Sequence, residues 1–307
     1  MSLVVGLVAF GVGLAVLVES VEGLVKALRA WAVASGVSGV VLGVLVLGFD
    51  VESTAAGVAA TLDDLPGTAL GASVGAAIFL LTVGLGVAAL IAPFALHVER
   101  RLLAIGAVAS ALPIALGVDG TLSRTDGAVL LVAFAPLVAV ALSARRTGTP
   151  PPAAGDAPAR RPDRLVLRVL AGIAGLVVGA ELLVFGTGRV VEELGFSETV
   201  FGLLVVAAAV SFEEIVLEAL PAFRGFPELS VGNALGTLVF LLTGSLGVIV
   251  LVRPIAVPDA VVDVHLPALA AVTALALALL WRGRMRRAEG GVLLAAYVAY
   301  AATALLA

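Results

Sequence analysis

Residues 201–240 read FGLLVVAAAVSFEEIVLEALPAFRGFPELSVGNALGTLVF, an apolar run that contains Glu213, Glu214 and Glu218. The run is long enough to enter a bilayer, whose hydrocarbon core is spanned by about 20 helical residues. A charge at the centre of such a helix costs roughly 2.5–3.5 kcal/mol by insertion scales. We therefore expect these glutamates to face a protein interior or a water-filled cavity, where they are paired or hold an ion.

A second stretch of the same kind lies in the first half of the chain. Residues 42–62 read LGVLVLGFDVESTAAGVAATL and place Asp50 and Glu52 in equally apolar surroundings. Any functional interpretation has to explain two acidic membrane segments, one in each half.

The composition indicates an all-α membrane protein. The chain has 307 residues, of which 61% are hydrophobic and 13% charged, and its mean hydropathy is +1.19. A soluble domain of this size needs a more polar surface, and membrane strands would appear as short alternating segments, which are absent. Without cysteine the chain has no thiolate metal site and no cysteine nucleophile. The expected partners are membrane lipid and small ions rather than nucleic acid.

The apolar pattern predicts ten transmembrane helices, arranged as two five-helix halves at residues 1–144 and 165–307. Between them, residues 145–164 are rich in Pro, Gly and Arg and are expected to form a flexible connector. The predicted spans cover residues 3–28, 37–62, 68–93, 100–117, 126–144, 165–190, 198–222, 229–252, 262–281 and 290–306.

Basic residues predict the orientation. The loops on the connector's side carry Lys26, Arg29, Arg100, Arg101, Arg224, Arg282, Arg284, Arg286 and Arg287. The loops on the other side carry Arg124, Arg189 and Arg253. By the positive-inside rule the connector is cytoplasmic and the N-terminus lies outside the cell membrane. Because each half has an odd number of spans, a duplicated second half would be inverted, as in many secondary transporters.

The two halves resemble each other in three blocks that occur in the same order. The matched pairs are residues 20–25 (SVEGLV) with 179–184 (GAELLV), 36–43 (GVSGVVLG) with 195–202 (GFSETVFG), and 70–87 (LGASVGAAIFLLTVGLGV) with 231–248 (VGNALGTLVFLLTGSLGV). We infer an internal duplication that matches Glu22 to Glu181.

Helical spacing separates the glutamates of residues 201–240. Ser211, Glu214 and Glu218 fall at positions i, i+3 and i+7 on one face, while Glu213 points roughly 100° away. Asn233 and Thr237 sit at i and i+4 in the next span and can face the same cavity. The structural alternative to ion binding is an interhelical hydrogen bond for the carboxylates, and packing between helices for Asn233 and Thr237. For Glu218, ion binding and the structural alternative are weighted equally.

In the first half, Asp50, Ser53, Thr54 and Gly57 form the corresponding stripe, with Glu52 on another face. An inverted two-fold axis would bring both stripes together near the bilayer midplane. Carboxylate and hydroxyl oxygens around a small cavity suit hard cations such as Ca²⁺ and Na⁺, or H⁺. A helix break at Gly48 would add free backbone carbonyls.

Four other residues are expected to lie outside this site. Glu22 and Glu181, toward the ends of their helices, are expected to be structural or to line a vestibule. His97 and His265 lie near predicted loops, where we expect solvated side chains.

These residues resemble the calcium/cation antiporter superfamily, whose best-known members are the sodium/calcium exchangers. The exchanger repeat reads approximately G-A-[DE]-x-L-V, then G-x-S-x-x-x-I-G-L-x-x-V-A-x-G-T-S-x-P-E, then V-G-N-x-x-G-S-N. Residues 179–184, 195–214 and 231–238 match it without a gap. The resemblance implies two inverted five-helix halves, and it sets Ser211 at the motif's serine, Glu214 at its ion-binding glutamate and Thr237 at its later serine.

The chain departs from that pattern at several positions. Ala209 and Val210 replace the motif's Gly-Thr, and Glu213 replaces its proline. In the first half two registers are open. An alignment from the downstream block places Asp50 at the motif's serine position and Ser53 at its glutamate position. An alignment from the upstream block places Glu52 and Ala55 at these two positions instead.

The resemblance implies a secondary antiporter that moves a cation such as Ca²⁺ against Na⁺ or H⁺. The candidate ion ligands are Asp50, Glu52, Ser211, Glu213, Glu214, Glu218, Asn233 and Thr237. The missing motif residues motivate an alternative, a diverged paralogue that binds ions or a partner without transporting them. An intramembrane enzyme is disfavoured because the chain has neither an H-E-x-x-H pair nor a G-x-S-x-G elbow. No resident cofactor is expected.

Overall fold

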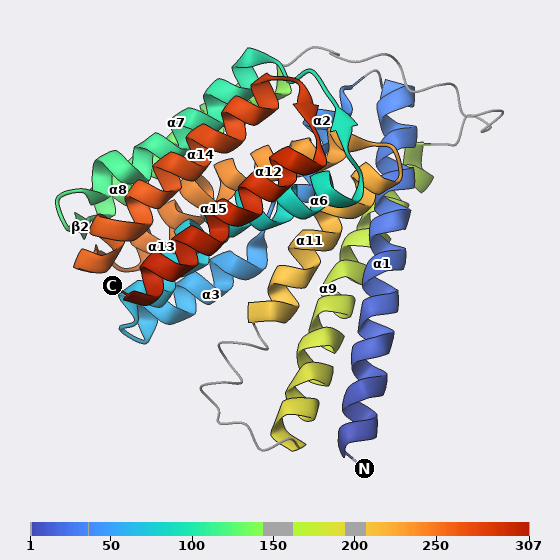
Figure 1. Cartoon of the computed structure of the whole chain (residues 1–307), viewed down its shortest axis with the longest axis horizontal. Coiled ribbons are helices and arrows are strands. Elements are labelled where there is room, and N and C mark those ends of the chain that lie inside the picture. The colour runs from blue at the N-terminus through green and yellow to red at the C-terminus, as the bar shows by residue number, and fades with distance from the viewer. Residues whose placement is uncertain (1, 36, 144–161, 194–206, 307) are drawn as a thin grey trace.

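The computed structural model of the chain describes residues 2–35, 37–143, 162–193 and 207–306, and nearly all of them are helical (Figure 1). The flexible connector was expected at residues 145–164. Residues 145–161 lie outside the described residues, and α9 begins at Pro162.

The first half alternates α-helices with short π-helical turns, which are labelled η. Its elements are α1 (Ser2–Ser35), α2 (Gly39–Leu42), η1 (Gly43–Leu47), α3 (Val51–Leu62), α4 (Pro66–Leu70), η2 (Gly71–Gly75), α5 (Ala76–Phe79), η3 (Leu80–Gly84), α6 (Leu85–Ile91), β1 (Phe94–Ala95), α7 (Arg100–Gly117), β2 (Thr121–Leu122) and α8 (Arg124–Leu142).

The second half repeats this order where it is described. Its elements are α9 (Pro162–Glu193), α11 (Ala207–Phe223), α12 (Pro227–Val239), η5 (Phe240–Ser245), α13 (Leu246–Val252), β3 (Ile255–Ala256), η6 (Val261–His265), α14 (Leu266–Trp281), β4 (Arg284–Met285) and α15 (Arg287–Leu306).

Within the described ranges, seven helical segments are long and apolar enough to cross a membrane. They are Leu3–Ala32, Pro66–Ile91, Arg100–Gly117, Arg124–Ala141, Leu165–Gly186, Pro227–Val252 and Val261–Trp281. Of the other three expected spans, the one at 37–62 is divided by a non-helical break at residues 48–50. The span at 198–222 is described only from Ala207, as α11, and the span at 290–306 lies within α15.

The third span has matched ends and a matched π-helical turn, η3 or η5, in the two halves. The third span of each half starts with a proline in its first turn, where the missing N–H costs nothing, and ends at a matched position: Pro66–Ile91 and Pro227–Val252. Thr82 in η3 and Thr243 in η5, which are equivalent in the duplication, each donate a hydrogen bond to the carbonyl four residues earlier. The duplication read from the sequence is thus present in the structure.

Packing between the halves follows the same symmetry. α6 packs on α15 as α13 packs on α8, and α11 packs on η3 and α6 as α3 packs on η5 and α13. Two short antiparallel ladders also join the halves, β1 with β4 and β2 with β3. They lie at opposite ends of the bundle, as an inverted repeat requires (Figure 1).

The long helices α1 and α9 run side by side next to the remaining bundle (Figure 1). Glycines allow this close approach, because a Cβ on Gly179 would lie 2.8 Å from the backbone nitrogen of Leu17. One buried cluster fills the main bundle, and a second joins α1 and α9 to η1, α11 and α12 through residues such as Leu24, Leu183 and Leu217. The α1–α9 pair therefore contacts the bundle through its own apolar interface.

Candidate functional site

Glu218 lies at one end of a buried polar chain on the α11–α12 hairpin. Gly225, at φ +81°, permits the tight turn that folds α12 back along α11. The Glu218 side chain is 0% exposed, and its Oε1 accepts a hydrogen bond from Asn233 Nδ2 at 3.1 Å. Asn233 Oδ1 in turn accepts from Thr237 Oγ1 at 3.5 Å. Three of the eight sequence-predicted ligands are therefore connected to one another.

The second carboxylate oxygen of Glu218 is available to a ligand. Oε2 is buried and has no hydrogen-bond partner among the described residues. Gly84 at the end of η3 makes room for the side chain, since a Cβ there would lie 3.0 Å from Glu218 Cγ. Glu214, one turn earlier on α11, is close enough for its charge to act on Glu218. Buried acceptor oxygens without donors are unusual in native proteins and call for an unseen donor, water or ion.

The first-half stripe begins at a helix break. η1 ends at Leu47 and α3 starts at Val51, so the break expected at Gly48 is confirmed. Asp50 caps α3, because its Oδ1 accepts from the Ser53 backbone N–H at 2.8 Å. Thr54 Oγ1 donates to Ser245 Oγ of η5 at 2.9 Å. The stripe thereby reaches across to the second half.

Glycines hold this break against α12. A Cβ on Gly48 would lie 2.7 Å from the Cα of Gly236, and one on Gly236 would lie 2.6 Å from the Cα of Val44. Gly43 and Gly232 make an equally close pair one turn away. Small residues at such positions let helix backbones approach each other in membranes. The broken segment therefore lies directly beside Gly236 and the adjoining Thr237.

The other predicted ligands are described less completely. Glu213 and Glu214 are half-buried on α11, and each interacts with the protein. Glu52 and Ser211 belong to α3 and α11, but their side chains lie outside what the structure describes. Among the described side chains, no group of three or more histidines, cysteines or carboxylates could hold a metal. A hard cation in this region would rely on neutral oxygens as well, which Ca²⁺ accepts.

A family model described as sodium/calcium exchanger protein matches residues 5–143 and 164–306, which is nearly the whole chain in two units. The chain belongs to the sodium/calcium exchanger protein family. It is accordingly a multi-pass integral membrane protein of a transporter family rather than an enzyme. The two matched units correspond to the two repeats seen in the fold.

Individual relatives support this family membership. The inner membrane protein YrbG of Escherichia coli is 28% identical over 264 residues, covering 79% of this chain and 78% of YrbG. The sodium/calcium exchanger MaX1 of Methanosarcina acetivorans is 30% identical over 139 residues, covering 44% of this chain. The protein named putative antiporter CaxA, from Alkalimonas amylolytica, is 33% identical over 132 residues. The chain spans 39% of the length of MaX1 and 41% of the length of CaxA.

The fold is that of a solved exchanger. The sodium-calcium exchanger NCX_Mj, in a crystal soaked with Na⁺ and Sr²⁺, superposes with a TM-score of 0.84, and the match covers 98% of both chains at 23% identity. The similarity establishes the exchanger family's architecture for this chain.

Sequence reasoning overlooked two neighbours of the site, Gly84 and Ser245. They occupy equivalent positions in the third matched block of the repeat, and each contacts the acidic helix of the other half. That equivalence was the signal that would have identified them. Because neither glycine nor serine carries a charge, these two residues did not stand out in an apolar helix.

The expectation of a solvated His265 was wrong. The histidine ends the π-helical turn η6, is half-buried, and places Nδ1 2.7 Å from Tyr300 Oη of α15. The helical segment begins at Val261, one residue before the predicted span, and the polar partner is a tyrosine that is distant in sequence. His97 is exposed, as expected.

We expect Asn233→Ala to destabilise the protein by about 1–3 kcal/mol, because Glu218 loses its only described donor while it stays buried. A double-mutant cycle with Glu218→Met, read by thermal unfolding in detergent, isolates the contact. The two substitutions should be non-additive by at least about 0.5 kcal/mol. Additive effects would mean that the Asn233–Glu218 hydrogen bond contributes nothing to stability.

Proposed function

We propose that the chain is a secondary antiporter that exchanges Ca²⁺ for Na⁺ or H⁺. The observation that carries the proposal is Glu218, a fully buried carboxylate with one oxygen bound to Asn233 and the other without a described partner. Burying such a group is costly unless it is paired, protonated or bound to a cation. A transported cation that binds to the buried Glu218 carboxylate and then leaves would explain why the chain keeps a glutamate at this position.

The proposed ion ligands come from both halves. The second half contributes Ser211, Glu213, Glu214 and Glu218 from α11 together with Asn233 and Thr237 from α12. The first half contributes Asp50 and Glu52 beside the break at Gly48, where backbone carbonyls are freed from helical hydrogen bonds. Oxygens alone, both charged and neutral, make this set suitable for hard cations.

Symmetric contacts support one register for the first half. Aligning the downstream blocks matches Gly57 to Glu218 and Ala88 to Ile249. A Cβ on Gly57 would collide with Ile249, and Ala219, next to Glu218, packs with Ala88. In this register Asp50 takes the place of Ser211 and Ser53 that of Glu214. The site would then be unequal, with its ionisable ligands concentrated on α11.

We further propose that protons drive the exchange more strongly than in a sodium-driven exchanger. Glu213, Glu214 and Glu218 lie within two turns of α11, and neighbouring carboxylates resist simultaneous ionisation. Binding of a divalent cation would therefore displace protons, and its release would allow them to return. The serine and threonine ligands that suit Na⁺ are fewer than in the exchanger motif.

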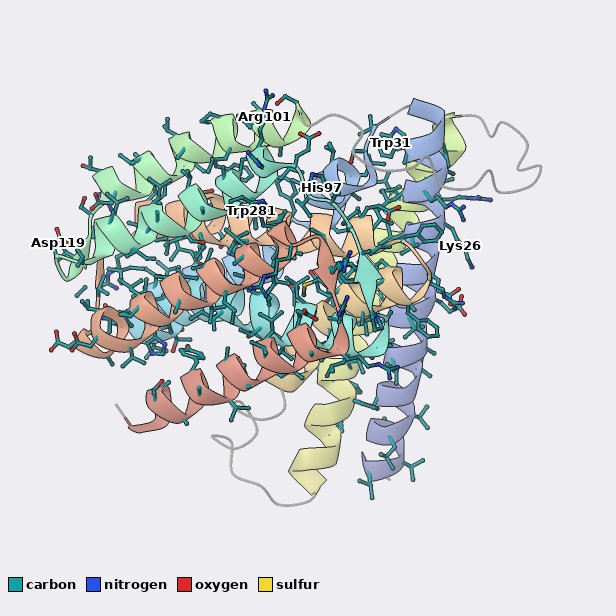
Figure 2. All side chains as sticks on the ribbon, turned by 45° about the horizontal axis from the view of Figure 1, so that its top comes forward. Lys26, Trp31, His97, Arg101, Asp119 and Trp281 are labelled. Atoms are coloured by element: carbon teal, nitrogen blue, oxygen red, sulfur yellow. The ribbon has the colours of Figure 1, made fainter. Side chains whose placement is uncertain are left out.

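The proposed orientation places the N-terminus outside and the connector in the cytoplasm. Figure 2 shows His97 and Arg101 toward one end of the bundle and Asp119 at the opposite end. At the first end Arg100 lies over the ring of Trp281, 5.7 Å from its centroid, a pairing suited to a membrane interface. Basic residues at this end support its assignment to the cytoplasmic side.

Alternating access, in the proposed mechanism, comes from the α1–α9 pair sliding across the remaining bundle. The pair contacts the bundle through an apolar interface that includes Leu17 and Leu217. Apolar contacts have no fixed direction, so such an interface can re-form after a displacement.

The test is ⁴⁵Ca²⁺ uptake into proteoliposomes that contain the purified chain. Our proposal predicts uptake driven by a pH gradient, which collapses when a protonophore dissipates the gradient. Uptake driven equally well by Na⁺ with no proton dependence would contradict proton coupling. Ca²⁺ binding without flux under any gradient would instead identify a non-transporting paralogue.

A further inference from the structure

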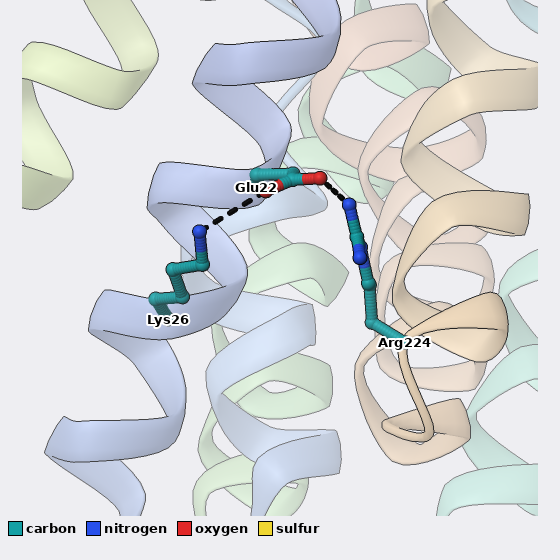
Figure 3. A network of polar contacts seen from close by, with 3 residues as sticks. All are labelled: Glu22, Lys26 and Arg224. Atoms are coloured by element: carbon teal, nitrogen blue, oxygen red, sulfur yellow. Dashed lines mark hydrogen bonds and ion pairs between the residues drawn. The ribbon is translucent and has the colours of Figure 1, made fainter.

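Glu22 of α1 is paired with two cations that belong to different parts of the molecule (Figure 3). Lys26 lies one turn along the same helix, with Nζ 3.0 Å from Glu22 Oε2, and is 75% exposed. Arg224 comes from the α11–α12 turn and pairs with Glu22 Oε1. The Glu22 side chain is only 14% exposed. The ion pair between Glu22 and Arg224 thus joins helices α1 and α9 to the end of α11, the helix that carries most of the candidate ligands.

A second cationic contact crosses the same interface. The guanidinium of Arg29, two turns further along α1, lies 4.4 Å from the ring centroid of Phe226 in the α11–α12 turn. α1 therefore meets this turn through two directional contacts, in addition to the apolar cluster below them. Unlike apolar packing, an ion pair and a cation–π contact favour one relative position of the two elements.

The duplication does not reproduce this contact at the other end of the molecule. It matches Glu22 to Glu181 and Arg224 to Asp63. Glu181 and Asp63 are both exposed, and Asp64 beside the latter pairs with Arg253 instead. If α9 approached the α3–α4 turn in the equivalent way, the two negative charges of Glu181 and Asp63 would come together, which is unfavourable. The attraction is therefore specific to one face of the protein.

We propose that Glu22 and Arg224 are positioning residues that hold the α1–α9 pair against the α11–α12 turn, favouring the state closed on the connector's side. This rests on the proposed alternating-access function. Because the opposite end has acids at both matched positions, the two access states are unequal in energy. Opening toward the connector breaks the Glu22–Arg224 pair, whereas opening toward the other side leaves it intact.

The absence of cysteine from the chain permits a direct accessibility test. Leu220 is half-buried on α11 against the cluster that joins α1 and α9, so Leu220→Cys provides a single reporter. The measurement is the rate of labelling by a membrane-impermeant maleimide, added from the connector's side to sealed vesicles. It needs no ion gradient, so it remains informative even if the chain moves no Ca²⁺.

We expect Arg224→Gln and Glu22→Gln each to increase the labelling rate by about threefold, consistent with the loss of a partly exposed ion pair. The double variant should label no faster than either single variant, and Arg224→Lys should restore the slow rate. Lys26→Gln is the matched control, because it removes the other cation and leaves Glu22–Arg224 intact. Unchanged rates, additive effects or a failure of Arg224→Lys to restore slow labelling would each overturn the proposal.

Discussion

Replacing Glu214 by Gln should abolish ⁴⁵Ca²⁺ uptake, lowering it on the order of 100-fold, while the protein still folds. The substitution removes one negative charge from the ligand set but keeps the side chain's size, and Ca²⁺ affinity depends strongly on the number of charged ligands. Glu214 lies one turn before Glu218 on α11, where its charge acts on the Glu218 carboxylate. Uptake into proteoliposomes under a pH gradient provides the measurement.

The matched control is Glu19→Gln on α1, because Glu19 is an exposed glutamate in a membrane helix that carries none of the candidate ligands. It should leave uptake within about twofold of the wild type, since surface charges contribute little. If Glu214→Gln instead reduced expression or thermal stability and left the flux of the surviving protein intact, Glu214 would be a structural residue. Equal flux in both variants would remove Glu214 from the ion site.

Gly236→Ala should destabilise the protein by about 1–3 kcal/mol, as an added methyl group does in a closely packed interface. Its Cβ would lie 2.6 Å from the backbone of Val44, so neither partner can move without displacing the break at Gly48. Because that break positions Asp50, flux should fall together with stability. Thermal unfolding of the detergent-solubilised protein measures the first effect, and proteoliposome uptake measures the second.

Gly11→Ala provides the control for this substitution. Gly11 is an exposed glycine inside α1, and a Cβ there would meet nothing within 4 Å among the described residues. The change should be neutral or stabilising by up to about 1 kcal/mol, since Ala is the better helix former. A Gly236→Ala variant as stable as Gly11→Ala would show that the α12–η1 contact is looser than the structure indicates.

Apolar patterning and the duplication were sufficient to predict the architecture. Long apolar runs have few alternatives to helices in a bilayer, because every backbone group must be hydrogen-bonded internally. Helix breaks were predictable only where a residue type marks them, as Gly48 does. The π-helical turns were not predicted, because they lie inside apolar helices and have no distinct composition.

The candidate site was only partly predictable, for a related reason. Charged residues in apolar helices drew attention to Glu214 and Glu218, but spacing alone could not tell a ligand from a buried hydrogen-bond acceptor. The pairing of Glu218 with Asn233 depends on the tight turn at Gly225, which sets how α11 and α12 align. Likewise, Glu22 was expected to be structural or to line a vestibule, but its partner Arg224 was not predictable because it lies 202 residues away in the sequence.

The most direct test of the proposed site is anomalous diffraction from crystals soaked in Ca²⁺. The site predicts one strong peak within about 2.3–2.6 Å of carboxylate oxygens from Glu214 and Glu218, the usual Ca²⁺–oxygen distance. Soaking at low pH should remove the peak as protons replace the ion. A structure at saturating Ca²⁺ in which these carboxylates bind only protein groups, with no ion beside them, would contradict the assignment.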